Sequence, residues 1–106
     1  MRIAVAALGK KKSSEIAEQA GRAPFYLIFD ENETLLETLK NPFSRGGGGV
    51  GFGVAKMLAD RKVSVAVAGD FGQKMTAALE QRGLRACKSK GTVLEALSNL
   101  EEQGKP

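Results

Sequence analysis

The stretch that decides the fold is VSVAVA, residues 63–68, which is followed at once by Gly69. A short and nearly continuous apolar run that ends at a glycine is typical of a β-strand buried on both faces of a sheet. A helical pattern with Met75 and Leu79 comes next and ends at Gly83, a typical C-cap glycine. A buried strand followed by a helix predicts a parallel sheet, because a right-handed crossover returns the chain to the same sheet.

A second buried strand is predicted at the start of the chain. The apolar run 3–8 closes at Gly9, and a polar loop follows it. Ser13 or Ser14 can cap a helix, and the apolar spacing that follows predicts a short helix that ends at about Ala20.

A hairpin separates these two strands in the sequence. Residues 25–29 and 34–39 predict two strands, and the acidic and amide residues 30–33 between them are typical of a turn. So short a connection predicts an antiparallel pair. Asn41-Pro42 then ends the second strand of the hairpin.

Three further elements follow the hairpin along the chain. After a glycine-rich loop, apolar residues at helical spacing predict a helix that ends at about Asp60. A short strand is predicted over 84–87, and the capping box of residues 92–95 opens a last helix. The order predicts one domain over 1–100 with a tail over 101–106. Its fold is α/β in three layers, a mixed five-stranded sheet with helices on both faces, which is the ribonuclease-H-like arrangement.

Size and composition restrict the class of protein. A chain of 106 residues is long enough for a single domain with its own core. The net charge of +4 favours anionic partners, but the chain has no long basic run of the kind that would predict nucleic-acid binding. The apolar start of the chain is too short for a signal peptide or a membrane span, and Cys87 as a single cysteine fits a reducing compartment. We therefore expect a cytoplasmic protein that does not bind membranes.

The loop from Arg45 to Gly53 is the most informative segment for function. Glycines let backbone N–H groups gather around an anion, and the start of a helix adds its dipole. The alternative is a flexible linker that serves the crossover. The glycines also match the G-x-G-x-x-G pattern of dinucleotide-binding proteins, but residues 41–45 with Pro42 stand where that pattern needs a buried strand.

Catalysis is not expected. The chain has no histidine, which removes the commonest general base. The strand 3–8 carries no carboxylate, whereas a ribonuclease-H-type nuclease needs several carboxylates around metal ions. Cys87 is read first as a small buried hydrophobic residue, with a cluster ligand or a reactive thiol as alternatives.

Several motifs together resemble one family. Gly-Arg-Ala-Pro-Phe-Tyr at 21–26, Asn41-Pro42 before the glycines, the strand that ends in Gly69-x-x-Gly72, and Gly-Thr-Val-Leu-Glu-Ala-Leu at 91–97 occur in the order and spacing of the dinitrogenase iron–molybdenum cofactor biosynthesis family. The resemblance covers about residues 1–100. That family includes nitrogenase accessory proteins, which carry the cofactor or its precursors, and small stand-alone archaeal and bacterial members. The resemblance implies a ribonuclease-H-like fold and non-catalytic binding of an iron–sulfur or iron–molybdenum cofactor precursor.

This chain departs from the family at Arg45, where many members carry a histidine before the glycines. One cysteine and no histidine cannot build an ordinary cluster site, so an anionic cluster would be held by charge and backbone N–H groups. We therefore predict a binding site formed by Arg22, Arg45, Gly46, Gly47, Gly48, Gly49, Gly69 and Gly72, with Cys87 as a weak metal candidate. The alternative function is an interaction or regulatory module that docks on a protein partner or forms a homodimer without a small ligand.

Overall fold

The computed structural model describes residues 1–45 and 50–102, with the side chains of 101 and 102 left aside. A five-stranded sheet has the order β3-β2-β1-β4-β5, in which β2 is antiparallel to both of its neighbours and β1, β4 and β5 are parallel. The strands are β1 (Arg2–Ala7), β2 (Phe25–Phe29), β3 (Leu35–Lys40), β4 (Val63–Ala68) and β5 (Arg85–Lys88). The helices are η1 (Ala20–Arg22, one 3₁₀ turn), α1 (Val50–Asp60), α2 (Gln73–Gln81) and α3 (Val93–Glu102).

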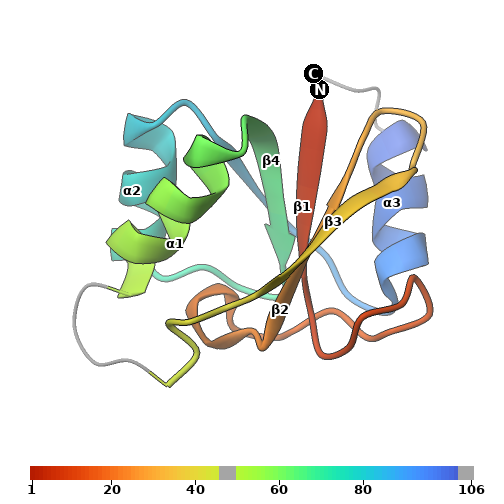
Figure 1. Ribbon diagram of the computed structural model, residues 1–106, viewed down its shortest axis with the longest axis horizontal. Helices are drawn as coiled ribbons and strands as arrows, with labels where there is room; N and C mark the ends of the chain where they lie inside the picture. The colour runs from red at the N-terminus through yellow and green to blue at the C-terminus, as the bar shows by residue number, and fades with distance from the viewer. Residues whose placement is uncertain (46–49, 103–106) are drawn as a thin grey trace.

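The sheet forms the middle of three layers. Helices α1 and α2 cover one face of the sheet and α3 covers the other (Figure 1). The mixed five-stranded sheet and the three-layer α/β/α fold predicted from the sequence are therefore confirmed. The parallel strands all end at one edge, and α1 and α2 begin at that same edge (Figure 1).

The strand pattern sets the two cores. In the central strands, successive side chains point to opposite faces. Ala4, Ala6 and Ala66 therefore face α1 and α2, whereas Val5 and Val65 face α3. Because alanines line much of the first face, two helices approach the sheet closely on that side.

Two of the predicted helix-terminal signals, at the end of α2 and the start of α3, are confirmed. Gly83 follows α2 with φ +81°, and the N–H of Leu84 bonds to the carbonyl of Leu79 at 2.9 Å, which closes the helix as a Schellman motif. At the start of α3, Thr92 and Glu95 cap each other's backbone N–H groups at 3.0 and 3.2 Å.

The helix predicted from Ser13 or Ser14 to Ala20 is wrong. Residues 15–20 run across the carboxyl ends of β1 and β4, and a 3₁₀ turn begins only at Ala20. The N–H of Ala17 donates to the carbonyl of Ala6, and the N–H of Gly69 donates to the carbonyl of Ala17, both at 2.9 Å. These long-range partners take the backbone groups that a helix would pair internally.

Other boundaries move by a few residues. The strand β3 begins at Leu35, because Glu33 has φ +63° and its N–H closes a turn onto Asp30. The strand β5 lies one residue later than predicted. The helix α1 begins at Val50, so the last part of the predicted glycine loop is helical, and α3 runs to Glu102.

Candidate functional site

The carboxyl edge of the parallel strands is where ligands bind in many open α/β sheets. Here the gap between the ends of β1 and β4 is filled by the chain itself. Ala17 bonds to both strand ends, and the N–H of Ala20 donates to the carbonyl of Asp70 at 3.1 Å. A ligand at this edge must therefore sit over this segment, between η1 and the starts of the helices.

A groove of about 330 Å³ lies at that place and is called the helix-start groove here. Its walls come from η1, from the first residues of α1 and from the start of α2. The lining residues are Gln19, Ala20, Gly21, Arg22, Val50, Gly51, Asp70, Gly72, Lys74 and Met75. Neither α1 nor α2 carries an acidic residue in its first turn, so two positive helix ends face the groove without a negative side chain of their own.

A second groove of about 600 Å³ adjoins it and is called the loop groove here. It lies between the start of β2 and the loop that follows β3. The lining residues are Arg22, Pro24, Phe25, Lys40, Asn41, Pro42, Ser44 and Arg45. Arg22 lines both grooves, and it therefore joins them into one basic surface.

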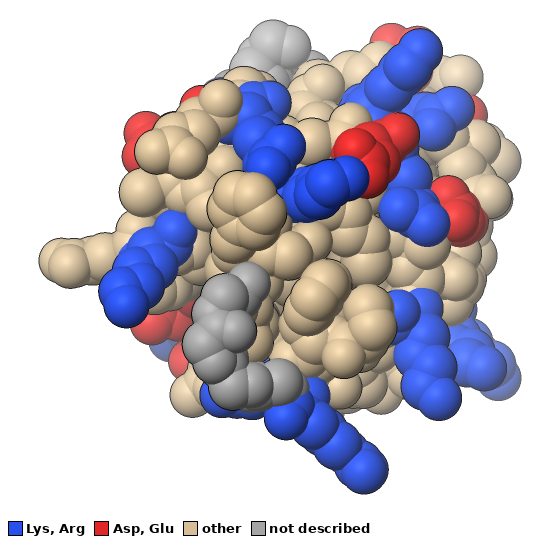
Figure 2. Space-filling view, turned by 60° about the vertical axis from the view of Figure 1, so that its left-hand side comes forward, with Lys and Arg blue, Asp and Glu red and all other residues tan. Residues whose placement is uncertain are grey.

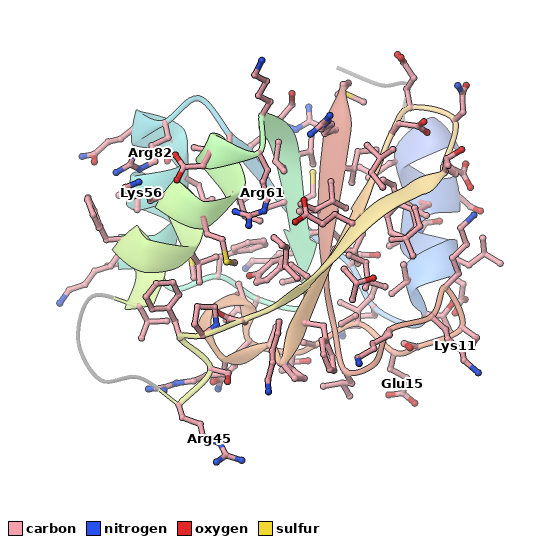
Figure 3. The ribbon with its side chains drawn as sticks, viewed as in Figure 1. Lys11, Glu15, Arg45, Lys56, Arg61 and Arg82 are labelled. Carbon is pink, nitrogen blue, oxygen red and sulfur yellow. The ribbon has the colours of Figure 1, made fainter. Side chains whose placement is uncertain are left out.

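The two predicted arginines lie on this surface in different ways. Arg22 is exposed at the end of η1, and its Nη1 donates to the carbonyl of Ser44 at 3.4 Å. This bond ties η1 to the loop after β3. Arg45 is also exposed, and its guanidinium extends away from the body of the fold (Figure 3). The structure thus brings Arg22 and Arg45 to one groove but leaves the Arg45 side chain to reach a ligand from outside.

Asn41 fixes the relative position of these two segments. Its side chain is 2% exposed. Its Nδ2 donates to the carbonyls of Gly21 at 3.2 Å and Ala23 at 2.9 Å, while its Oδ1 accepts the N–H of Phe43 at 3.0 Å. A buried amide satisfied on both sides holds η1 against the loop, because each lost bond would leave a buried polar group unpaired. From the sequence, Asn41 is predicted only to end a strand and to form part of a family motif, and no local pattern indicates its buried bonds to η1.

The predicted glycines have separate places. A Cβ at Gly69 would lie 2.8 Å from the Cα of Glu18, so this glycine permits the close passage of residues 15–20 over β4. Gly72 lines the helix-start groove, and a Cβ there would meet nothing within 4 Å. Gly46, Gly47, Gly48 and Gly49 lie outside the described residues.

The charged side chains that line the helix-start groove are mostly basic, and Asp70 is the one carboxylate among the described lining residues. Lys88 Nζ lies 3.0 Å from Asp70 Oδ1, and this hydrogen bond, together with the N–H of Phe71 and the charge of Lys88, lowers the pKa of Asp70. Lys74 adds a positive charge in the first turn of α2. Sequence reasoning missed Lys74, although a lysine two residues after Gly72 is the signal that could have found it.

The sequence profile of dinitrogenase iron–molybdenum cofactor proteins matches residues 1–103. This chain belongs to that family. The match runs through every described element of the fold, and it confirms the resemblance found in the motifs. No curated protein matches the chain.

Solved structures share the fold of this chain. The apo form of the orange protein from Desulfovibrio gigas is 26% identical with a TM-score of 0.89, and the match covers 99% of this chain and 90% of that one. A NifB-like protein from Thermotoga is 23% identical with a TM-score of 0.78 over 98% and 89% of the two chains. A dinitrogenase-related protein from Methanocaldococcus jannaschii is 14% identical with a TM-score of 0.62 over 99% and 90%. The last two show the fold alone.

The family name raises the question of which residues suit a metal cluster. Among the described side chains of 1–45 and 50–100, no three His, Cys, Asp or Glu residues gather as metal ligands. Cys87 is half-buried and packs against the core under α3, away from the residues that line the grooves. The described part of this family member therefore offers cationic groups and helix starts in place of direct ligands. In the same part of the chain, no helix is long and apolar enough to cross a membrane.

Proposed function

We propose that this protein is a non-catalytic carrier that binds an anionic metallocluster, of the iron–sulfur or iron–molybdenum precursor type, at the surface formed by the helix-start and loop grooves. One observation carries the proposal: the starts of α1 and α2 line one groove together with Arg22 and Lys74. Two helix ends and two cations around a single opening favour a negatively charged ligand.

The type of site suits transfer of the cluster rather than permanent retention. Sulfide and oxide groups on an anionic cluster accept hydrogen bonds from guanidinium and backbone N–H groups. Such contacts are reversible, whereas thiolate ligands bind iron directly and hold it firmly. Arg22, Arg45 and Lys74 are all exposed, so a receiving protein can reach the bound cluster.

Family membership supports this choice of ligand over other anions. The family is named for the iron–molybdenum cofactor, and the orange protein was solved in an apo form, which implies a form with a bound group. The single cysteine also fits a cytoplasmic protein, where thiols stay reduced.

The proposal is tested by anaerobic incubation of the purified protein with ferrous iron, sulfide and molybdate, followed by desalting and measurement of protein-bound metal. We expect the Arg22→Ala/Arg45→Ala double variant to bind at least about tenfold more weakly, because it removes two charge-assisted donors. Both side chains are exposed, so the thermal unfolding midpoint should stay close to that of the wild type.

The matched control is Arg82→Ala/Arg85→Ala, which makes the same change in net charge. Arg82 ends α2 and Arg85 begins β5, so both lie at the opposite end of α2 from the grooves. This control should bind metal as the wild type does. Equal affinity of both double variants and the wild type, or no bound metal in the wild type, would contradict the proposal.

A further inference from the structure

A third groove, of about 620 Å³, lies between α1 and the end of β3 and is called the edge groove here. Most of its lining is apolar, and it follows one face of α1. The lining residues are Leu39, Lys40, Pro42, Phe43, Phe52, Gly53, Lys56, Met57, Asp60 and Arg61. Phe52 is 59% exposed and adds its aromatic ring to this apolar lining, so the apolar surface here is continuous.

The strand beside this groove has an open backbone edge. β3 is the outermost strand of the sheet, paired with β2 on one side. The N–H of Asn41 donates to the carbonyl of Pro24 on the β2 side at 3.0 Å. Since antiparallel residues alternate between inward and outward bonding, the backbone groups of Thr38 and Lys40 point outward. They can pair with another strand.

The groove and the open edge fit a single occupant. A strand added beside β3 would extend the sheet, and every second side chain of that strand would face the helix layer. Leu39 of β3 already packs into the core under α1, and Phe43 and Met57 pack against the same core. Apolar side chains of an added strand on that face would enter the edge groove and cover Phe52.

Charge around the groove decides which strand fits. Four basic and two acidic side chains surround it. Lys56 pairs with Asp60 and Arg61 pairs with Glu37, so the excess positive charge lies at Lys40 and Arg82. The Arg82 guanidinium lies over the Phe52 ring at 4.8 Å, and Figure 3 shows Lys56 and Arg82 on the same side of the helices. Figure 2, turned toward this side, shows blue Lys and Arg side chains, with some red Asp and Glu side chains among them, around a tan area of uncharged residues.

The excess positive charge argues against a second copy of this chain. Two copies that paired through β3 would bring their basic residues together across a two-fold axis. An acidic partner would instead meet a groove that carries an excess of positive charge.

We propose that β3 and the edge groove bind an extended segment of a partner protein, in which acidic residues alternate with apolar ones. The segment adds to the sheet as a sixth strand through the backbone of Thr38 and Lys40. Its apolar side chains cover Phe52 and Met57 on the helix face. Its carboxylates alternate with them and lie on the opposite face of the sheet, beside Lys40, which follows the inward-facing Leu39. This proposal does not depend on the metal-binding function, since Phe52 and Thr38 line neither of the other two grooves.

The test uses the full chain and a fluorescently labelled synthetic peptide of about eight residues, in which glutamate alternates with leucine and phenylalanine. Fluorescence anisotropy measures the affinity. We expect Thr38→Pro to weaken binding at least about tenfold, because proline removes an outward N–H that the added strand needs. Thr38→Ala keeps that N–H and should bind within about twofold of the wild type.

A second variant probes the groove without touching the strand. Phe52→Ala should weaken binding at least about fivefold, because exposed aromatic anchors carry much of the energy of such interfaces. Its matched control is Leu94→Ala, which truncates an exposed apolar residue on α3. Replacing the peptide's glutamates with glutamine should reduce both the affinity and its dependence on salt.

Three results would overturn the proposal. The first is that the peptide does not bind the wild-type protein. The second is that Phe52→Ala and Thr38→Pro bind the peptide as tightly as the wild type does. The third is self-association: if sedimentation shows a dimer that Thr38→Pro converts to a monomer, the occupant of β3 is a second copy. Metal binding measured on the same variants should stay at the wild-type value, which separates this result from a failure of the carrier function.

Discussion

At the scale of single residues, the buried polar groups position the site. Tyr26 lies in the apolar run of β2, and its hydroxyl donates to the carbonyl of Ala20 at 2.6 Å. That bond fixes the first residue of η1, two residues before Arg22. Burial raises the pKa of the Tyr26 hydroxyl well above its usual range, because the interior disfavours the charged form.

This shift predicts a loss of stability at high pH. In the unfolded chain, tyrosine ionises at about pH 10. The folded chain keeps its proton there, so the unfolded state binds fewer protons and the free energy of unfolding falls as pH rises above about 10. Because Tyr26 is the single tyrosine of the chain, its tyrosinate absorbance should appear only together with loss of the far-UV circular dichroism signal.

The Tyr26→Phe variant is the control for this titration. It should be less stable near neutral pH by about 1 kcal/mol, since the Ala20 carbonyl loses its partner. Above pH 10 its stability should fall less steeply than that of the wild type. A tyrosinate signal from fully folded wild-type protein near pH 10 would contradict the assignment of Tyr26 as a buried hydroxyl.

At the scale of elements, the segment 15–20 determines where a ligand can bind. It closes the gap between β1 and β4, and it directs η1 toward the start of α1. Gly69 permits this path, because any larger residue would collide with the backbone of Glu18. Gly72, three residues later, borders the helix-start groove and has open space around it.

The two glycines should therefore respond differently to substitution. Gly69→Ala should lower the free energy of unfolding by about 1–3 kcal/mol, because the segment 15–20 must shift to admit the new methyl group. Gly72→Ala should cost less than about 1 kcal/mol, which is the expected loss from replacing a glycine N-cap of α2 with alanine. Urea unfolding measures both values.

Amide hydrogen exchange tests the same prediction at the residues close to Gly69. In Gly69→Ala the amide of Ala20, which bonds to the carbonyl of Asp70, should exchange faster than in Gly72→Ala. Equal stabilities of the two variants, with equal exchange at Ala20, would show that the close passage over Gly69 is not required.

At the scale of the whole molecule, charge is distributed in favour of an anion. The chain carries a net charge of +4, and two helix starts lie at the edge that carries Arg22 and Lys74. Within the helix-start groove, the negative charge of Asp70 opposes the positive charge of Arg22, Lys74 and the helix starts. The carboxylate of Asp70 is ionised at neutral pH like that of an ordinary aspartate, and it pairs with Lys88, which lowers the pKa of Asp70 further.

Removing that carboxylate should strengthen ligand binding. Asp70→Asn removes a negative charge from the groove and frees Lys88 to face the ligand. We expect the affinity for the anaerobically assembled iron, sulfide and molybdate species to rise about threefold at low salt, and the gain to shrink as salt rises.

Asp60→Asn is a closely matched control for this change. Asp60 has the same 57% side-chain exposure as Asp70 and likewise pairs with a lysine at 3.0 Å, but it lies at the end of α1. The control should leave metal binding unchanged. An equal rise in both variants would mean that net charge acts alone. An unchanged affinity in Asp70→Asn would place the ligand away from this groove, and a lower affinity would contradict repulsion between Asp70 and the ligand.

The sequence by itself determined the strands, the mixed five-stranded sheet and most of the helices. These features follow from local patterns: the apolar run at 63–68, the hairpin at 25–39, the glycine after α2 and the capping box before α3. Each pattern depends on residues within a few positions of one another, so these elements can be predicted from the sequence without the tertiary structure. The motifs around Arg22 and Asn41 also identified the family correctly.

The tertiary structure alone decided the path of residues 15–20 and the composition of the grooves. Ala17 is extended because Ala6 and Gly69, distant in sequence, supply its hydrogen-bond partners. Gly51 is helical because α1 packs at close range on Met75, although glycine has a low intrinsic preference for helices. Long-range packing and hydrogen bonding outweigh local preference at these places, so no local sequence pattern predicts the extended segment 15–20 or the helical Gly51.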